Sequence, residues 1–323
     1  MAFIRTIALS AFLCPILALC AAAVPLAETD TVAATAYAPP TPRISKFSVS
    51  ANMETIGNSD YYIKEYGHRI EEGHQSHYSK TNVRVSAPVL YWKKILFSLY
   101  ATYAYIHQDF EPRMQTIDYG MGSKEHHNYT LGINLMSKTK LWGKTLTWVA
   151  IAGCDFTKYG YERTTGMLTA ILNVKESRET TLGVGLIGLY NTFSNVPLIP
   201  IVTYRHTFSP KLSLNLTLPR YHVRYTPNKH DALSLGVGYS STSVFIKPED
   251  NSDYETCRHT RFSLVPTLLY ERTLADGLIL SAEGGYSIPV TNRINEYSNT
   301  HRIASVHQSP RPLFKIGISY NLY

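Results

Sequence analysis

Three histidines and two glutamates stand close together in the segment "GHRIEEGHQSHYS": His68, His74, His77, Glu71 and Glu72. Imidazole and carboxylate groups are common ligands of divalent metal ions, so this segment could gather one. The spacing lacks the helical H-E-x-x-H register of a zinc protease. A polar surface loop is therefore the favoured interpretation, with metal binding as the lesser alternative, and we expect no cofactor.

Motifs for catalysis or nucleotide binding are absent elsewhere in the sequence. There is no G-x-S-x-G nucleophile elbow, no G-x-x-x-x-G-K-[ST] loop and no Cys–His metal spacing. Serine and histidine are plentiful, but acyl transfer needs a nucleophile, a base and an orienting group within reach of one another. We therefore expect a protein that is not an enzyme, and an envelope enzyme is only a minor alternative.

The charge balance is basic, with 31 Lys and Arg against 24 Asp and Glu and a formal net charge of +7. Basic proteins bind nucleic acids, anionic membrane surfaces or acidic solutes. The basic residues are scattered and form no run of five or more, so a nucleic-acid partner is not expected.

The first residues are typical of an export signal. A short basic flank precedes the apolar stretch "TIALSAFLCPILALCAAAV", and Ala21 and Ala23 form an A-x-A site that predicts cleavage after Ala23. An uncleaved anchor and lipidation at Cys20, in the lipobox-like "LALC", are alternatives. Three segments follow from this: a signal peptide at 1–23, a flexible periplasmic lead-in at 24–43 and a folded unit at 44–323.

From Ile44 onward the apolar residues recur with a period of two. In "ALSLGVGYS", for example, Leu233, Leu235 and Val237 alternate with serine and glycine, and "NYTLGINLM" and "TTLGVGLIGLY" repeat the pattern. Such alternation predicts strands whose two faces differ in polarity. A soluble sandwich with its apolar face inward and a membrane barrel with its apolar face outward both satisfy it.

Three features favour the membrane barrel. Many strands reach about ten residues, as a tilted strand needs in order to cross a bilayer, whereas strands in soluble sheets are shorter. Tyr and Trp gather at strand ends, where interfacial girdles lie. The connections alternate between short and long, as in outer-membrane barrels.

We therefore predict an all-β fold, a transmembrane antiparallel β-barrel of about 12–14 strands. Even-numbered connections such as "WKK", "ESRE" and "SP" are brief and are assigned to the periplasm, and the long loops 54–81, 108–126, 247–258 and 289–312 to the outside. The fourteen candidate strands are 44–53, 82–91, 95–107, 127–138, 145–155, 166–175, 180–191, 199–208, 211–218, 220–226, 232–246, 259–271, 277–288 and 313–323.

If the apolar faces meet lipid, the other faces line the lumen. More basic than acidic side chains then point inward, which could bias a pore toward anions, although a charge-paired interior that fills a narrow barrel is the favoured alternative. The candidate lumen-lining residues are Arg205, His222, Arg224, Arg261, Glu271, Glu283 and Lys315.

Two cysteines remain after cleavage, Cys154 and Cys257. An exported protein is in a disulfide-permissive compartment. Both cysteines fall at the outer end in this topology, so a disulfide between them is permitted, although their strands are far apart around the barrel.

The chain ends in "LFKIGISYNLY", whose alternate residues are apolar. The last strand of a membrane barrel must close onto the first because the hydrocarbon leaves no backbone group unpaired. The ending resembles the insertion signal that the barrel-assembly machinery recognises, with Tyr323 out of phase. The signal residues are Phe314, Ile316, Ile318, Tyr320, Leu322 and Tyr323.

The stretch "LGVGLIGLYNTFSNVPLIPIVTYRHTFSPKLSLNLTLPRYHVRYTPNKHDALSLGVGYS" resembles an uncharacterised outer-membrane β-barrel family of Bacteroidota-type bacteria. The similarity rests on an "N-x-P-L-x-P-I-V-x-Y" strand, an "S-P-K-x-S-L" turn and an "L-P-R-Y" break. The resemblance implies the fold and a location in the cell outer membrane, and it carries no known activity.

Two functions follow as hypotheses. The first is a porin-like channel or solute-binding barrel of a Gram-negative outer membrane, with lipid and a small solute as partners. The second is a non-transporting structural barrel whose long loops contact envelope components. The polar, glycine-rich inner face favours the first, and the size of the loops favours the second.

Overall fold

The computed structural model describes residues 47–92, 94–111, 125–191, 198–246, 257–296 and 302–322. The predicted signal peptide, the lead-in and Tyr323 lie outside these residues, as do parts of the loops 108–126, 247–258 and 289–312. Every element of the described chain is a β-strand, and none of its residues form a helix long and apolar enough to cross a membrane.

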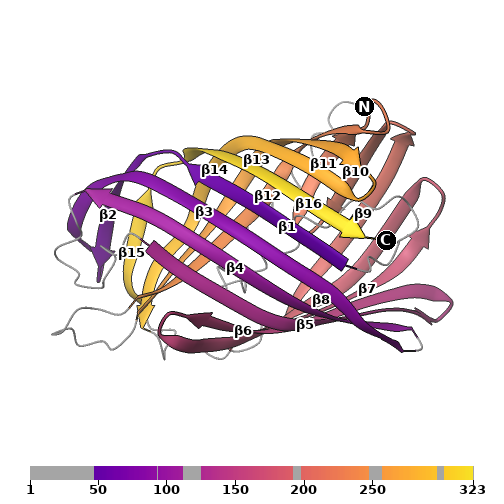
Figure 1. Ribbon diagram of the computed structural model, residues 1–323, viewed down its shortest axis with the longest axis horizontal. Helices are drawn as coiled ribbons and strands as arrows, with labels where there is room; N and C mark the ends of the chain where they lie inside the picture. The colour runs from indigo at the N-terminus through magenta and orange to yellow at the C-terminus, as the bar shows by residue number, and fades with distance from the viewer. Residues whose placement is uncertain are drawn as a thin grey trace, which may run out of the picture.

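From β2 to β14 the strands follow one another as antiparallel neighbours (Figure 1). The strands are β1 (Phe47–Ile56), β2 (Ser59–Glu65), β3 (His68–Trp92), β4 (Ile95–Glu111), β5 (Glu125–Leu141), β6 (Lys144–Thr157), β7 (Gly160–Glu176), β8 (Thr180–Asn191), β9 (Leu198–Ser209), β10 (Leu212–Thr217), β11 (Arg220–Tyr225), β12 (Asp231–Ile246), β13 (Cys257–Ala275), β14 (Leu278–Glu296), β15 (Arg302–Gln308) and β16 (Arg311–Leu322).

The sheet closes on itself because β1 pairs with β16 on one side and with β3 on the other. The β1–β16 register runs from Phe47 opposite Leu322 to Ile56 opposite Leu313. Within the described residues β1, β3 to β14 and β16 form a closed wall of 14 strands. The prediction of a transmembrane barrel is therefore confirmed, and of the predicted range of 12 to 14 strands the upper value is correct.

The outer face of the wall is apolar. Along β16 the side chains of Phe314, Ile316 and Ile318 are exposed, while Lys315 and Gly317 point to the other side. Leu235 of β12 and Leu131 of β5 are likewise more than half exposed. Burial of such side chains is the main driving force of folding in water, so an exposed band of this kind marks a surface that contacts lipid.

Aromatic side chains border this band at two levels. We call the end of the barrel that holds Phe47 and Leu322 the turn end, and the opposite end the loop end. Amphipathic rings favour the interface between lipid and water. Exposed rings at the turn end belong to Tyr91, Trp92, Trp142, Phe208 and Tyr225, and those at the loop end to Tyr129, Tyr161, Tyr190 and Tyr286.

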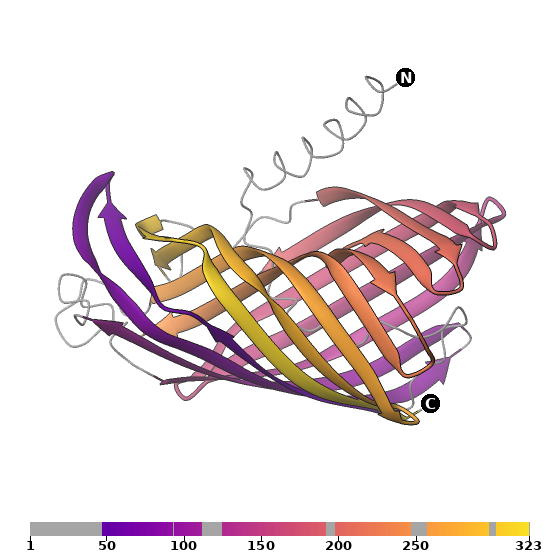
Figure 2. The ribbon, with the colours of Figure 1, turned by 90° about the horizontal axis from the view of Figure 1, so that it is seen from above.

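The predicted long loops at 54–81 and 289–312 are wrong in part. β3 extends through most of the first loop and forms a hairpin with β2, and β15 in the second loop pairs with both β2 and β14. The resulting sheet rises beyond the barrel wall at the loop end (Figure 2). Alternation did not identify these strands, because a sheet outside the membrane can carry polar and charged residues on both faces.

The inner face of this loop-end sheet covers an apolar core. Its members include Ile56, Ile63, Tyr78, Ile294 and Val306, all nearly inaccessible to solvent. A buried polar network adjoins them. Arg311 donates to Gln75 Oε1 at 2.6 Å and to Gln308 Oε1 at 3.1 Å. The loop end of the lumen is therefore packed on the side of β1 to β4.

The wall is uneven in height. β3 has 25 residues and β13 and β14 have 19 each, but β10 and β11 have 6 each. In Figure 1 the short pair lies away from β2 and β15, at the other end of the long axis.

Candidate functional site in the barrel lumen

All seven predicted lumen residues alternate along their strands with the exposed apolar side chains. Arg205 is opposite Thr181 of β8, and His222 and Arg224 follow one another on the same face of β11. The exposed Val223 and Tyr225 occupy the other face of that strand. The remaining four are Arg261 and Glu271 of β13, Glu283 of β14 and Lys315 of β16.

Five charged residues form a row across the inner face. Glu54 of β1 is directly opposite Lys80 of β3 on one side and Lys315 of β16 on the other. Lys315 is in turn opposite Glu283, which forms an ion pair with Arg220 of β11. Opposite charges that face one another across neighbouring strands stabilise a sheet. We call these residues the charge row.

Further ion pairs continue the polar lining. Arg224 pairs with Glu271, and Arg163 of β7 donates through Nε to Asp155 of β6 at 2.7 Å. Asp155 also accepts a hydrogen bond from Thr130 Oγ1 of β5 at 2.7 Å. Charges that are paired and hydrogen-bonded tolerate burial better than isolated ones.

The loop-end part of the β12–β13 hairpin crosses the lumen. Residues 241–246 are buried on both faces, whereas a wall strand exposes one face to lipid. The Asn128 side chain of β5, on the opposite wall, donates a hydrogen bond to the backbone carbonyl of Ser243 at 3.2 Å. Arg163 lies over the ring of Phe245 at 5.4 Å. The other side of the hairpin contacts β3, where the hydroxyls of Tyr78 and Thr242 are 3.4 Å apart.

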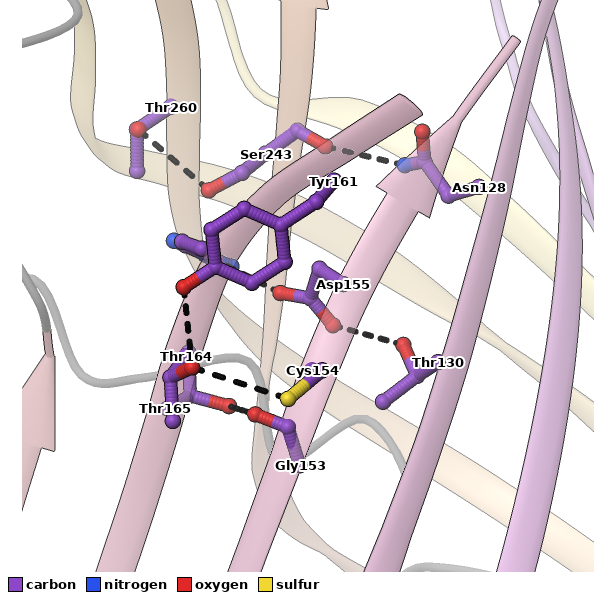
Figure 3. Close-up of polar contacts among 11 residues, drawn as sticks. Asn128, Thr130, Gly153, Cys154, Asp155, Tyr161, Thr164, Thr165, Ser243 and Thr260 are labelled. Carbon is purple, nitrogen blue, oxygen red and sulfur yellow. Dashed lines mark hydrogen bonds and ion pairs between the residues drawn. The ribbon is translucent and has the colours of Figure 1, made fainter. Parts of the chain in front are cut away.

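Figure 3 shows this junction and the polar contacts of β6 and β7 beside it. Ser243 lies between Thr260 of β13, 3.4 Å away between hydroxyl oxygens, and Asn128. Asp155 and Thr130 lie on the same side as Asn128. The crossing hairpin therefore divides the loop end of the lumen and rests on β3 and on β5 to β7.

An apolar cluster lies on the inner face of β7 to β9. Ile187, Leu189 and Ile201 are buried, on the strand faces opposite the exposed Leu186 and Val202. Met167, Ile171, Ile199 and Leu218 pack against them. We call these seven residues the lumen cluster. The lumen thus combines a charged region with one apolar region.

Several of these residues were missed by sequence reasoning. Glu54 and Lys80 fell in the stretch predicted as a loop, although each continues the alternation of its strand by one step. Arg220 is in phase with His222 and Arg224, so the same signal could have found it. The alternation places Asn128 on the inner face with Thr130, but it could not identify its partner, because that contact depends on the curvature of a distant hairpin.

The three loop histidines are not brought together. His68 ends the hairpin opposite Glu65, His74 Nδ1 is 2.8 Å from Asp60, and the ring of His77 neighbours that of His107. No group of three or more metal-binding side chains exists within the described residues. The segment belongs to β3, so the expected surface loop is also wrong.

The two cysteines are both free, so the disulfide that the sequence permits is not formed. Cys154 of β6 has its sulfur 3.5 Å from Thr164 Oγ1, and Cys257 is buried at the start of β13. Six strands separate β6 from β13 along the wall, which keeps the thiols apart.

Solved structures with distant similarity are bacterial outer-membrane barrels. The COG4313 outer membrane channel from Pseudomonas putida F1 shares 9% identity and a TM-score of 0.44, over 89% of this chain and 100% of that one. A Pseudomonas aeruginosa FadL homologue gives 10% and 0.42, over 87% and 91%. The outer membrane protease OmpT from Escherichia coli gives 9% and 0.33, over 88% and 99%. These similarities are too distant to carry a function to this chain.

No curated protein matches the sequence. A family model does match, over residues 49–321, which is nearly the whole barrel together with its loop-end sheet. The chain therefore belongs to the family described as Domain of unknown function (DUF6268).

Proposed function

We propose that this protein is an outer-membrane barrel of a Gram-negative bacterium that binds and passes a small solute through its lumen. The charge row is the observation that carries the proposal. It places five ionic side chains on the inner face of a wall whose outer face is apolar. An interior of this kind favours water and polar solutes over lipid.

The crossing hairpin acts as the constriction of this channel. It is joined to the opposite wall by the hydrogen bond from Asn128 to Ser243 and by the contact of Arg163 with Phe245. A net hydrogen bond contributes on the order of 1 kcal/mol. Loss of one such contact should therefore raise the population of a released hairpin about fivefold.

Planar-bilayer recording of the purified protein tests the proposal. We expect single-channel conductance in the wild type, and more frequent or larger openings in Asn128→Ala. Asn134→Ala is the matched control, because Asn134 lies on the same strand and face and its Oδ1 has no hydrogen-bond partner among the described residues. Absence of conductance in both the wild type and Asn128→Ala, together with no solute uptake into liposomes, would contradict the proposal.

A second candidate function is contact with an envelope component at the loop end. The outer face of the loop-end sheet carries His307 stacked on Tyr62 at 4.6 Å, with the cations of Arg69 and Lys64 near the same ring. Such a face suits the phosphate groups of membrane glycolipids. If titration with lipopolysaccharide raises the Tm of the wild type but not of Lys64→Ala, this function gains support.

We also propose that the barrel is not an enzyme and that β16 serves as its insertion signal. The first statement is supported by the lack of catalytic motifs in the sequence, and an activity screen of purified protein would test it. The second is supported by the lipid-facing row Phe314, Ile316 and Ile318. Polar substitutions in this row should lower the amount of folded protein in the outer membrane.

A further inference from the structure

Four buried side chains with unused hydrogen-bond donors lie near one another on the inner face of β13, β14 and β16. Arg261 and Ser263 are successive inner residues of β13, and Ser287 of β14 is directly opposite Arg311 of β16. None of the four is more than 6% exposed. Within the described residues, Arg261 Nη2, Arg311 Nε and the two serine hydroxyls have no hydrogen-bond partner. We call these four residues the arginine–serine site.

Strand β3 holds the two guanidinium groups close to each other. A β-bulge between Gln75 and His77 places the side chains of Gln75 and Tyr78 both inward, where they are almost inaccessible to solvent. Gln75 accepts a hydrogen bond from Arg311, and the ring of Tyr78 lies 4.0 Å from the guanidinium carbon of Arg261. The positive charge of Arg261 acts on that of Arg311. The fold therefore keeps two like charges together away from bulk water.

The amide oxygens around Arg311 are already fully used. Gln75 Oε1 accepts from Arg311 at 2.6 Å and from Gln308 Nε2 at 2.9 Å. Gln308 Oε1 accepts from Arg311 and from Asn292 Nδ2, both at 3.1 Å. A carbonyl oxygen has two lone pairs, so neither amide can accept a further hydrogen bond. The site is therefore rich in donors and poor in acceptors.

The two arginines also lack a carboxylate partner within the residues that the structure describes. Three other arginines of the lumen, Arg163, Arg220 and Arg224, each form an ion pair with an acidic side chain, but Arg261 and Arg311 do not. A buried charge is costly unless it is paired. A carboxylate or phosphate oxygen is negatively charged and only accepts hydrogen bonds, so it would satisfy both the charges and the donors.

We propose that the arginine–serine site binds a small oxyanion, a carboxylate or a phosphate, through the two guanidinium groups and the two serine hydroxyls. The proposal rests on the proposed transport function and gives its substrate class. A guanidinium group binds the oxygens of such an anion in pairs, which a spherical chloride ion cannot match. The site therefore selects oxyanions over chloride.

The position of the site fits a role in transport. Ser287 and Arg311 lie four residues beyond Glu283 and Lys315 of the charge row along the same two strands, about 13 Å at about 3.3 Å per residue. Arg261 is directly opposite Thr242, in the part of the hairpin that crosses the lumen. An oxyanion that enters from the turn end therefore meets the charge row first and the arginine–serine site next, at the constriction.

Oxyanion binding can be measured through the Tm of the purified barrel in detergent. Sodium phosphate or sodium acetate replaces sodium chloride at constant ionic strength. We expect at least one of the two oxyanions to raise the Tm of the wild type in a saturable manner, because a ligand of the folded state stabilises it. A response to phosphate alone or to acetate alone supports the site and identifies the anion that it prefers.

Variants assign the response to the site. Arg261→Gln should weaken the binding at least about tenfold, because it removes a charge and the paired donors. Arg272→Gln is the matched control, since Arg272 lies at the turn end with its side chain 56% exposed, and it should keep the wild-type response. If Arg261→Gln fails to fold, Arg261→Lys keeps the charge but loses the planar fork, and it should also bind more weakly than the wild type.

Two results would overturn the inference: a Tm that responds to neither oxyanion, and an oxyanion response that Arg261→Gln or Arg261→Lys leaves unchanged. Wild-type protein that conducts ions but shows no oxyanion response would overturn this inference and leave the channel proposal standing. A saturable response in a protein without conductance or solute uptake would confirm the site and contradict the channel.

Discussion

Single charges in the lumen are held by neighbours on other strands. Glu283 has Lys315 directly opposite it on β16 and forms an ion pair with Arg220, which also donates to Thr267 Oγ1 at 2.8 Å. The two partners of the ion pair are 20% and 12% exposed. Removing the carboxylate would leave two cations without their shared anion, which costs more than the pair itself contributes.

Glu283→Gln should therefore affect both stability and selectivity. We expect the free energy of unfolding in detergent to fall by about 3 kcal/mol. The reversal potential in a salt gradient should shift toward anion preference, because the lumen loses a negative charge. Glu179→Gln, at an exposed turn-end position, is the control and should change neither quantity. An unchanged reversal potential would show that Glu283 does not face the ion path.

His307 makes the loop-end sheet sensitive to acid. Partial burial, together with Lys64 and Arg302, lowers the pKa of His307 below its ordinary value of 6.5. Because its pKa is lower in the folded state than in the unfolded chain, His307 takes up a proton more readily when the chain unfolds. The contribution of neutral His307 to stability is therefore complete above pH 6.5 and is lost as the pH falls below that value. After correction for the intrinsic slowing of amide exchange in acid, the β2 and β15 amides should therefore be less protected against hydrogen exchange at pH 5.5 than at pH 7.5.

The variant His307→Phe keeps the stack on Tyr62 but cannot be protonated. In this variant the loss of protection at pH 5.5 should disappear, while His68→Phe at the hairpin tip should leave it in place. Persistence of the effect in His307→Phe would assign it to another group.

At the scale of the element, turn geometry fixes the registers of neighbouring strands. Trp142 and Gly143 connect β5 to β6 with φ values of 50° and 73°. Two positive φ values in succession are typical of the two-residue turns whose twist matches that of antiparallel strands. Tryptophan rarely adopts a positive φ, so the turn depends on Gly143, which adopts one without strain.

Gly143→Ala should lower the free energy of unfolding by about 1 kcal/mol, because an L-residue is strained in the left-handed region. No atom lies within 4 Å of the position its Cβ would take, so the cost is conformational and not steric. The control is Gly284→Ala, whose Cβ would first meet Phe314 at 3.8 Å and whose φ is not positive. Urea midpoints in detergent measure both, and equal losses would contradict the conformational explanation.

Strand positions could be predicted from the sequence because alternation reports one-sided contact with lipid. It located all 14 wall strands, most of them to within a few residues. The larger differences are β3, which begins at His68 instead of 82, β7, which begins at Gly160 instead of 166, and β14, which ends at Glu296 instead of 288. β2 and β15 could not be found in this way. They lie outside the membrane, where both faces can be polar and the period of two fades.

The candidate site was only partly predictable for a related reason. Alternation assigns a face to Glu283 or Arg224 but not a partner, since pairing depends on the register between strands distant in sequence. Two strands lie between Arg220 and Glu283, and one strand lies between Arg224 and Glu271. The alternation of apolar and polar residues stops at 241–246, which reads "STSVFI", but a loss of alternation does not say that the strand bends into the lumen.

For the molecule as a whole, the arrangement is the inverse of a soluble protein. The apolar faces of the wall strands point outward all round the barrel, and the charge row and ion pairs lie inside. The effect of a substitution on the free energy of unfolding then depends on how deep the outward-facing residue lies in the bilayer. Burying a charge in hydrocarbon is costly at the midplane and nearly free at the interface, where long side chains reach water.

Leu186 lies near the middle of β8, is 50% exposed and points outward, whereas Trp142 lies in a turn and is 84% exposed. Leu186→Arg should lower the free energy of unfolding in lipid vesicles by about 2–4 kcal/mol, and Trp142→Arg by about 0–1 kcal/mol. If Leu186 instead faced water, the difference between the two variants would vanish, because substitutions at water-exposed positions change stability by less than about 0.5 kcal/mol. Equal costs, or a wild-type protein that stays folded and monodisperse without detergent, would mean that the apolar band does not contact lipid.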